Sequence, residues 1–202
     1  MTSTSVEQAL RTKKFSKKRI EVLRGAARVF ARLGFHRASL NAVGDELEMT
    51  SAALYYYVKS KADLLFQIGE VTMTILKESV EGSEVEHENG YEHLRFFFRR
   101  YAELICDDFG SCFVLYNADD LPAELQGQDL GRRREIDQMA RNIISAAIKD
   151  GSLSPVEPRA LGSFLFGAIN SLPKWYSADG DLKPAEIADQ YLDIVSNGIR
   201  PQ

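Results

Sequence analysis

The stretch SLNAVGDELEMTSAALYYYVKSK, residues 39–61, contains two short helical patterns with almost no linker between them. In the first pattern, apolar residues recur at helical spacing behind Ser39, a residue type that favours a helix N-cap. The second pattern begins near Thr50 and continues to Val58, so that only residues 48–49 turn the chain. Two short helices joined by so tight a turn predict a helix-turn-helix, which presents its second helix to a DNA major groove.

Charge is distributed unevenly along the 202 residues. The net charge is −4, yet residues 1–65 hold 12 Lys and Arg against 6 Asp and Glu, while residues 66–202 hold 13 against 23. We call residues 1–65 the head and residues 66–202 the body. A basic head beside an acidic body is expected when one end of a protein binds phosphates. With 45% hydrophobic residues and no apolar run near the roughly 20 residues of a membrane span, we expect a cytoplasmic protein with no membrane partner.

An amphipathic helix and a basic arm precede the helix-turn-helix. Apolar residues recur at helical spacing from Ser16 to Leu33, and Gly34 supplies the left-handed residue that commonly ends a helix. Residues 1–15 have no apolar face and are expected to form a flexible arm, and residues 16–60 the DNA-binding domain. A basic run is often only a solvated tail, but beside a helix-turn-helix we expect phosphate or minor-groove contacts from Lys13, Lys14, Lys17 and Lys18.

Residue types within the two short helices favour contact with DNA. Hydroxyls and free backbone N–H groups at helix starts suit phosphate, small side chains let a helix approach base edges, and tyrosine and lysine side chains donate to phosphates. The predicted contacts here are Ser39, Thr50, Ser51, Ala52, Ala53, Tyr55, Tyr56 and Lys61. Leu54 and Tyr57 are expected to pack in the core. Because few of these side chains read base edges, arm contacts and DNA shape are expected to contribute to specificity.

These residues resemble the TetR family of bacterial transcriptional regulators over about residues 17–66. The resemblance is carried by Gly34-Phe35, Ser39-Leu40, Leu54-Tyr55-Tyr56-Tyr57, Ser60-Lys61 and Asp63-Leu64-Leu65. It implies an all-α homodimer whose C-terminal domain, here residues 61–202, binds a small effector and so controls affinity for a palindromic DNA operator. Two positions depart from the family pattern, with Glu48 where glycine is usual and Val58 where phenylalanine is usual. A positive φ at Glu48 would cost about 1 kcal/mol relative to glycine.

The sequence of the body predicts a series of helices. Helical patterns cover residues 61–80, 91–106, 130–149, 158–176 and 181–200, with a further apolar piece beginning at residue 113. The segment 158–176 is apolar nearly all round and must be covered on all sides, and Pro173 is expected to end or kink it. The last two helices are expected to pair with their copies in a dimer through Leu161, Phe164, Leu165, Ala168, Leu172, Ile187, Tyr191, Ile194 and Val195.

Aromatic residues in the acidic body are numerous enough to line a ligand cavity, although each is also a candidate for plain core. Arg132, Arg133 and Arg134 form a cationic run at a place where the helix dipole does not favour it. The C-terminal pattern loosely resembles TetR-type regulators of fatty-acid and steroid catabolism, whose effectors are acyl-CoA thioesters. The expected ligand-binding residues are Phe97, Tyr101, Phe113, Tyr116, Arg132, Arg133, Met139, Phe166 and Trp175.

No phosphate loop, nucleophile elbow or zinc-protease motif occurs, so we expect neither an enzyme nor a bound cofactor. His87 and His93 match no compact metal-ligand spacing, and Cys106 and Cys112 read as reduced core thiols. The leading hypothesis is a ligand-released repressor. The alternatives are an activator or a regulator that needs its ligand to bind DNA, a helical acyl carrier or enzyme in which the basic head is incidental, and an architectural DNA binder.

Overall fold

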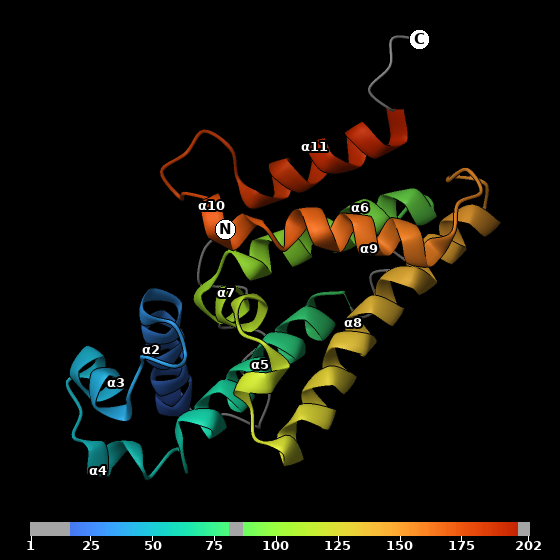
Figure 1. The fold of residues 1–202 in the computed structure, drawn as a ribbon. Helices are drawn as coiled ribbons and strands as arrows, with labels where there is room; N and C mark the ends of the chain where they lie inside the picture. Colours follow the sequence, from blue (N-terminus) through green and yellow to red (C-terminus); the bar gives the residue numbers. More distant parts are fainter. Residues whose placement is uncertain (1–16, 81–86, 198–202) are drawn as a thin grey trace. The chain divides into compact units, whose positions relative to one another are not determined.

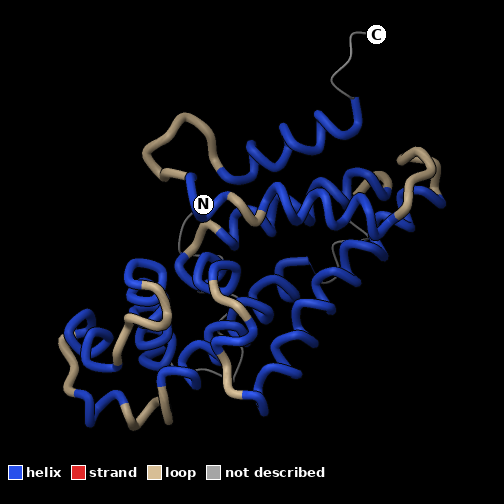
Figure 2. Tube along the Cα trace, viewed as in Figure 1, coloured by secondary structure: helices blue, strands red, loops and turns tan. Residues whose placement is uncertain are grey.

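The computed structural model describes residues 17–80 and 87–197. Every regular element in these ranges is a helix, as expected from the sequence (Figures 1 and 2). The elements are α2 (Lys17–Leu33), α3 (Leu40–Leu47), α4 (Ser51–Leu54), α5 (Lys61–Val80), α6 (Gly90–Ile105), α7 (Asp108–Leu115), η2 (Ala118–Asp120), α8 (Ala123–Lys149), α9 (Pro158–Ile169), α10 (Leu172–Trp175) and α11 (Pro184–Asn197). None of these helices is long and apolar enough to span a membrane.

The chain divides into two compact units. Among the described residues, the first takes 17–78 together with Asp107–Arg132, and the second takes 79–80, 87–106 and 133–197. These units are defined by how the helices pack. The boundaries expected at residues 15 and 60 separate an arm, a DNA-binding domain and an effector-binding domain, and they stay a prediction.

The first unit is built around α2, which packs against α3 and α7. Leu23, Phe30, Leu54, Leu64 and Phe109 are at most 4% exposed and form part of its core. Helix α2 approaches α3 so closely at Gly25 that a Cβ there would lie 2.6 Å from Leu47 Cδ2.

The second unit is built around α6, which packs against α10 and α11, and α11 also packs against α9. Phe97, Phe98, Ile144, Leu165 and Ile169 are fully buried in it.

Several helix boundaries differ from those expected. Helix α7 begins at Asp108 and not at residue 113, and α11 begins at Pro184 and not at residue 181. Helix α4 ends at Leu54, because Tyr56 and Tyr57 close tight turns by donating to the carbonyls three residues earlier. Helix α8 begins at Ala123, seven residues earlier than the apolar pattern indicated. The pattern over 158–176 forms α9 and α10, because Pro173 has no N–H to continue the hydrogen-bond ladder of α9.

Glu48 adopts the left-handed conformation, with φ 54° and ψ 38°, as the C-cap of α3. We therefore expect Glu48→Gly to stabilise the protein by about 1 kcal/mol, which raises Tm by about 2–4 °C at this chain length. Gly34 has φ 75° and no atom within 4 Å of the place that a Cβ would take, so Gly34→Ala is the matched control and should lower Tm. Thermal unfolding followed by circular dichroism checks both, and an unchanged or lower Tm for Glu48→Gly would show that the turn is not strained.

Candidate nucleic-acid interface and effector site

The turn between α3 and α4 is fixed by its backbone. Met49 N donates to the Gly44 carbonyl at 2.9 Å, and a Cβ on Gly44 would lie 2.6 Å from Met49 O, so only glycine fits there without movement. The Ser39 and Thr50 hydroxyls cap their helices by accepting from backbone N–H groups at 3.1 and 3.2 Å. The structure thus forms the expected helix-turn-helix from the residue types that predicted it.

Half of the predicted DNA contacts lie on α4, on its N-cap Thr50 and on the turn that follows. Tyr56 is 84% exposed and Tyr55 58%, whereas Leu54 is fully buried, as expected. Ala52 is also exposed, and Lys17 and Lys18 are exposed at the start of α2. Ser51 donates to Asn41 Oδ1 at 2.7 Å, and Ala53 is half-buried. Large aromatic rings that are exposed to solvent beside a helix-turn-helix are typical of a binding surface. Lys13 and Lys14 lie outside the described residues.

Lys61 has a different environment from the one expected. Its Nζ donates to the backbone carbonyls of Phe35, His36 and Ala38 at 2.7, 3.3 and 3.0 Å, and it lies 4.4 Å from the centroid of the Phe35 ring. An ammonium has three hydrogens, and these three carbonyls engage all of them. We therefore remove Lys61 from the proposed phosphate contacts and assign it to the turn between α2 and α3.

Two arginines of α2 hold α3 in place. Arg28 Nε and Arg32 Nη2 donate to the two carboxylate oxygens of Glu46 at 3.0 and 3.1 Å. The hydrogen bonds from Arg28 and Arg32 hold the pKa of Glu46 below its usual value. The stabilisation by this pairing is therefore present at neutral pH and is lost as the pH falls through the lowered pKa.

The same face of α2 is also tied to α7. Arg24 Nη1 donates to Asp107 Oδ2 at 2.8 Å, and Arg28 Nη1 lies 3.5 Å from Asp108 Oδ2. The Arg24 guanidinium also lies 4.6 Å from the ring centroid of buried Phe109. Arg28 therefore bridges α3 and α7, so that a shift of α7 changes the contacts of the helix-turn-helix.

The sequence reasoning missed this arginine row. Its members, Arg24, Arg28 and Arg32, recur at every fourth position of a helix and so share one face. That spacing was readable from the sequence. Their carboxylate partners lie on two other helices, and no pattern along the chain pairs them.

Three predicted ligand residues belong to the first unit. Phe113 and Tyr116 are buried with ring centroids 5.9 Å apart, and the Tyr116 hydroxyl donates to the fully buried Asp129. The Arg132 guanidinium lies 3.9 Å from the Phe66 ring centroid and forms a hydrogen bond with the Phe66 carbonyl. Tyr116 and Arg132 are therefore already partnered within the chain.

Four other predicted ligand residues gather in the second unit. Phe166 of α9 meets Phe97 and Tyr101 of α6 edge to face, with ring centroids 6.4 and 5.1 Å apart. The Tyr101 hydroxyl donates to Asn170 Oδ1 at 2.7 Å. Burial raises the pKa of Tyr101, and the positive charge of Arg133 opposes that shift in part. The second unit therefore places aromatic rings, a phenol and a cationic side chain in one neighbourhood.

The remaining two predicted ligand residues, Met139 and Trp175, differ in exposure. Met139 is half-buried on α8. Trp175 is 54% exposed, and its Nε1 donates to Ser171 Oγ at 3.1 Å on the preceding turn. Because its ring faces solvent, we remove Trp175 from the proposed ligand site.

The predicted dimer residues also divide in two. Four of them, Leu161, Leu165, Leu172 and Ile187, are at most 7% exposed and belong to the core of the chain itself. Because they are buried within the chain, we leave these four out of the proposed interface. Apolar periodicity does not distinguish a helix face that packs within the chain from one that packs against a partner. Phe164 and Ile194 are 57% and 49% exposed, and Ala168, Tyr191 and Val195 are not among the buried core residues.

Comparison with known proteins assigns the family. Residues 22–68 match the model for bacterial regulatory proteins of the tetR family, and residues 87–199, more than half of the chain, match the tetracyclin repressor-like C-terminal domain. The chain belongs to the TetR family. It is a ligand-responsive transcriptional regulator with a helix-turn-helix, not an enzyme.

Relatives of this TetR-family regulator match along nearly the whole chain. The HTH-type transcriptional repressor KstR2 of Mycolicibacterium smegmatis is 23% identical over 185 residues, 90% of each chain. Among solved structures, KstR2 of Mycobacterium tuberculosis has a TM-score of 0.80 at 20% identity, covering 94% of this chain and 98% of its own. AibR in complex with isovaleryl coenzyme A and operator DNA has a TM-score of 0.77 at 24% identity, covering 88% and 97%. PfmR of Thermus thermophilus has a TM-score of 0.79 at 24% identity, covering 89% and 99%.

Proposed function

We propose that this regulator is a homodimeric repressor that binds a palindromic operator through α4 and is released when an acyl-CoA binds the second unit. The observation that carries the proposal is the cluster of Phe97, Tyr101 and Phe166, with the charge of Arg133 beside the Tyr101 phenol. Aromatic rings suit an acyl chain, and a guanidinium suits a phosphate of the coenzyme. The complex of AibR with isovaleryl coenzyme A and operator DNA supports the choice of ligand class.

Release requires that the acyl-CoA bind the DNA-incompetent state more tightly than the DNA-bound state. The exposed Phe164 and Ile194 side chains support association through α9 and α11. In the proposed dimer, the two α4 helices would enter major grooves about 34–36 Å apart, the spacing of half-sites on one face of DNA.

A gel-shift titration on the DNA flanking the gene tests this proposal. We expect saturable, salt-sensitive binding that is weakened by one or more members of a panel of acyl-CoAs from acetyl to palmitoyl, and left unchanged by free coenzyme A. Arg133→Gln should weaken the acyl-CoA response by about tenfold without loss of Tm, because a charge-assisted hydrogen bond is removed. Arg134→Gln is the matched control, since Arg134 lies next along the same helix. A protein that binds operator but responds to no acyl-CoA would contradict the ligand assignment.

A further inference from the structure

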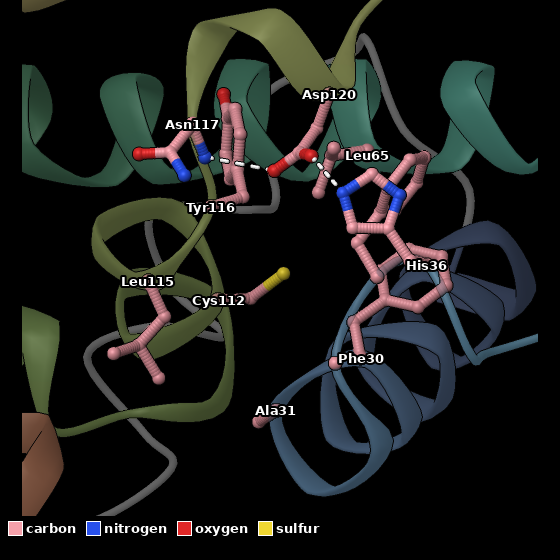
Figure 3. A pocket seen from close by; sticks show the side chains of 11 residues that line it. Phe30, Ala31, His36, Leu65, Cys112, Leu115, Tyr116, Asn117 and Asp120 are labelled. Atoms are coloured by element: carbon pink, nitrogen blue, oxygen red, sulfur yellow. Dashed lines mark hydrogen bonds and ion pairs between the residues drawn. The ribbon is translucent and has the colours of Figure 1, made fainter.

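A cavity of about 260 Å³ lies within the first unit, whereas the aromatic cluster proposed for the acyl-CoA belongs to the second. It is lined by Phe30, Ala31 and Phe35 from the α2 side, by Leu65 of α5, and by Cys112 and Tyr116 from α7 and its C-cap. Figure 3 shows the Cys112 side chain pointing from α7 into the space in front of α2. An engineered apolar cavity of about 150 Å³ holds benzene, so this one has room for an aromatic ring with a few further atoms.

One side of the cavity carries a hydrogen-bonded carboxylate. His36 Nε2 lies 2.8 Å from Asp120 Oδ1, and Asn117 N donates to Asp120 Oδ2 at 2.9 Å (Figure 3). The Asp120 side chain is 10% exposed, whereas that of His36 is 83% exposed and is easily displaced. A carboxylate oxygen accepts up to two hydrogen bonds, so Asp120 has capacity for a donor on a ligand.

Charge decides which ligands suit this cavity. The Asp120 carboxylate lines the cavity and repels an anion. An uncharged molecule with a hydroxyl group avoids that penalty and can donate to Asp120. The apolar walls suit an aromatic ring.

We propose that this cavity is a second small-molecule site, which takes a neutral aromatic alcohol or phenol. The polyanionic coenzyme A is excluded from it by charge and by size, so this proposal stands independently of the acyl-CoA assignment. Phe35 and His36 lie between α2 and α3, and an occupant therefore contacts the segment that leads into the helix-turn-helix.

The probe for the test is benzyl alcohol, titrated into the full-length isotope-labelled protein and followed by amide NMR. We expect saturable shifts at residues lining the cavity, with a dissociation constant of about 0.1–1 mM, as is typical of a ligand with so few atoms. Benzoate, which has a similar shape but a negative charge, should bind at least about tenfold more weakly. Toluene, which lacks the hydroxyl group, should also bind more weakly.

Two substitutions at the cavity complete the test. Ala31 is an exposed helix position, so Ala31→Leu should fill the cavity and abolish the shifts without unfolding the protein, whereas Ala31→Ser should retain them. Asp120→Asn keeps a hydrogen-bond acceptor but removes the charge, and should bring benzoate to within about threefold of benzyl alcohol. The absence of saturable shifts at 10 mM benzyl alcohol (a concentration about tenfold above the weakest expected constant), equal binding of benzoate to the unchanged protein, or full binding by Ala31→Leu would each overturn the proposal.

Discussion

Replacing Gly90 with alanine is expected to destabilise the protein by about 3 kcal/mol, near the upper end of the usual cost of overpacking. A Cβ at Gly90 would lie 2.4 Å from Ala147 Cα and 2.6 Å from Ala147 N. The atoms in the way are backbone, so no change of side-chain rotamer relieves the clash. The start of α6 would have to move away from α8, and the hydrogen bond from Gly90 N to Asp150 Oδ2, now 2.7 Å, would lengthen with it.

The matched control for this prediction is Gly131→Ala. Gly131 is also a helical glycine, on α8, but no atom lies within 4 Å of the place that its Cβ would take. Removing glycine from an open helix position stabilises a protein by up to about 1 kcal/mol. Urea unfolding of the two variants should therefore shift the midpoint in opposite directions. Equal midpoints would show that the contact of Gly90 with Ala147 is not tight in solution.

The sequence predicted the helix-turn-helix well because every signal needed for it is local. Ser39 and Thr50 cap helices in the structure as their residue types indicated, and Glu48 takes the left-handed conformation that its place in the turn suggested. Val58, where the family usually has phenylalanine, is 2% exposed, so a smaller apolar side chain occupies the core there. Hydrogen bonds and φ angles within a turn depend on neighbouring residues, and the sequence shows those directly.

The candidate effector site was less predictable, because apolar character does not say what covers a side chain. Phe97 and Trp175 were grouped together from the sequence, yet one is fully buried and the other 54% exposed. Leu165 and Phe164 are neighbours in one apolar helix, but only the first faces the core of the chain. Pairings such as that of His36 with Asp120 join residues far apart in the sequence, and periodicity carries no information about them.

Replacing Ala52 with glutamate should strongly weaken operator binding while the protein remains folded. Ala52 is an exposed residue in the first turn of α4, where an acidic side chain is compatible with helix formation. On DNA the same side chain would bring a negative charge, and a much longer chain than a methyl group, against base edges and phosphates. At about 1–3 kcal/mol for each half-site, the proposed dimer should lose about 2–6 kcal/mol of binding free energy, which is at least about 30-fold in affinity.

The matched control is Gln128→Glu, which makes the same change of net charge at an exposed position of α8. The control reports how far one added negative charge outside α4 weakens binding, and long-range repulsion decreases as salt screens it. A loss of affinity that is confined to Ala52→Glu and that remains at about 0.3 M salt, where the Debye length is only about 6 Å, would therefore report direct contact of α4 with the operator. Wild-type affinity for Ala52→Glu would exclude α4 as the recognition helix.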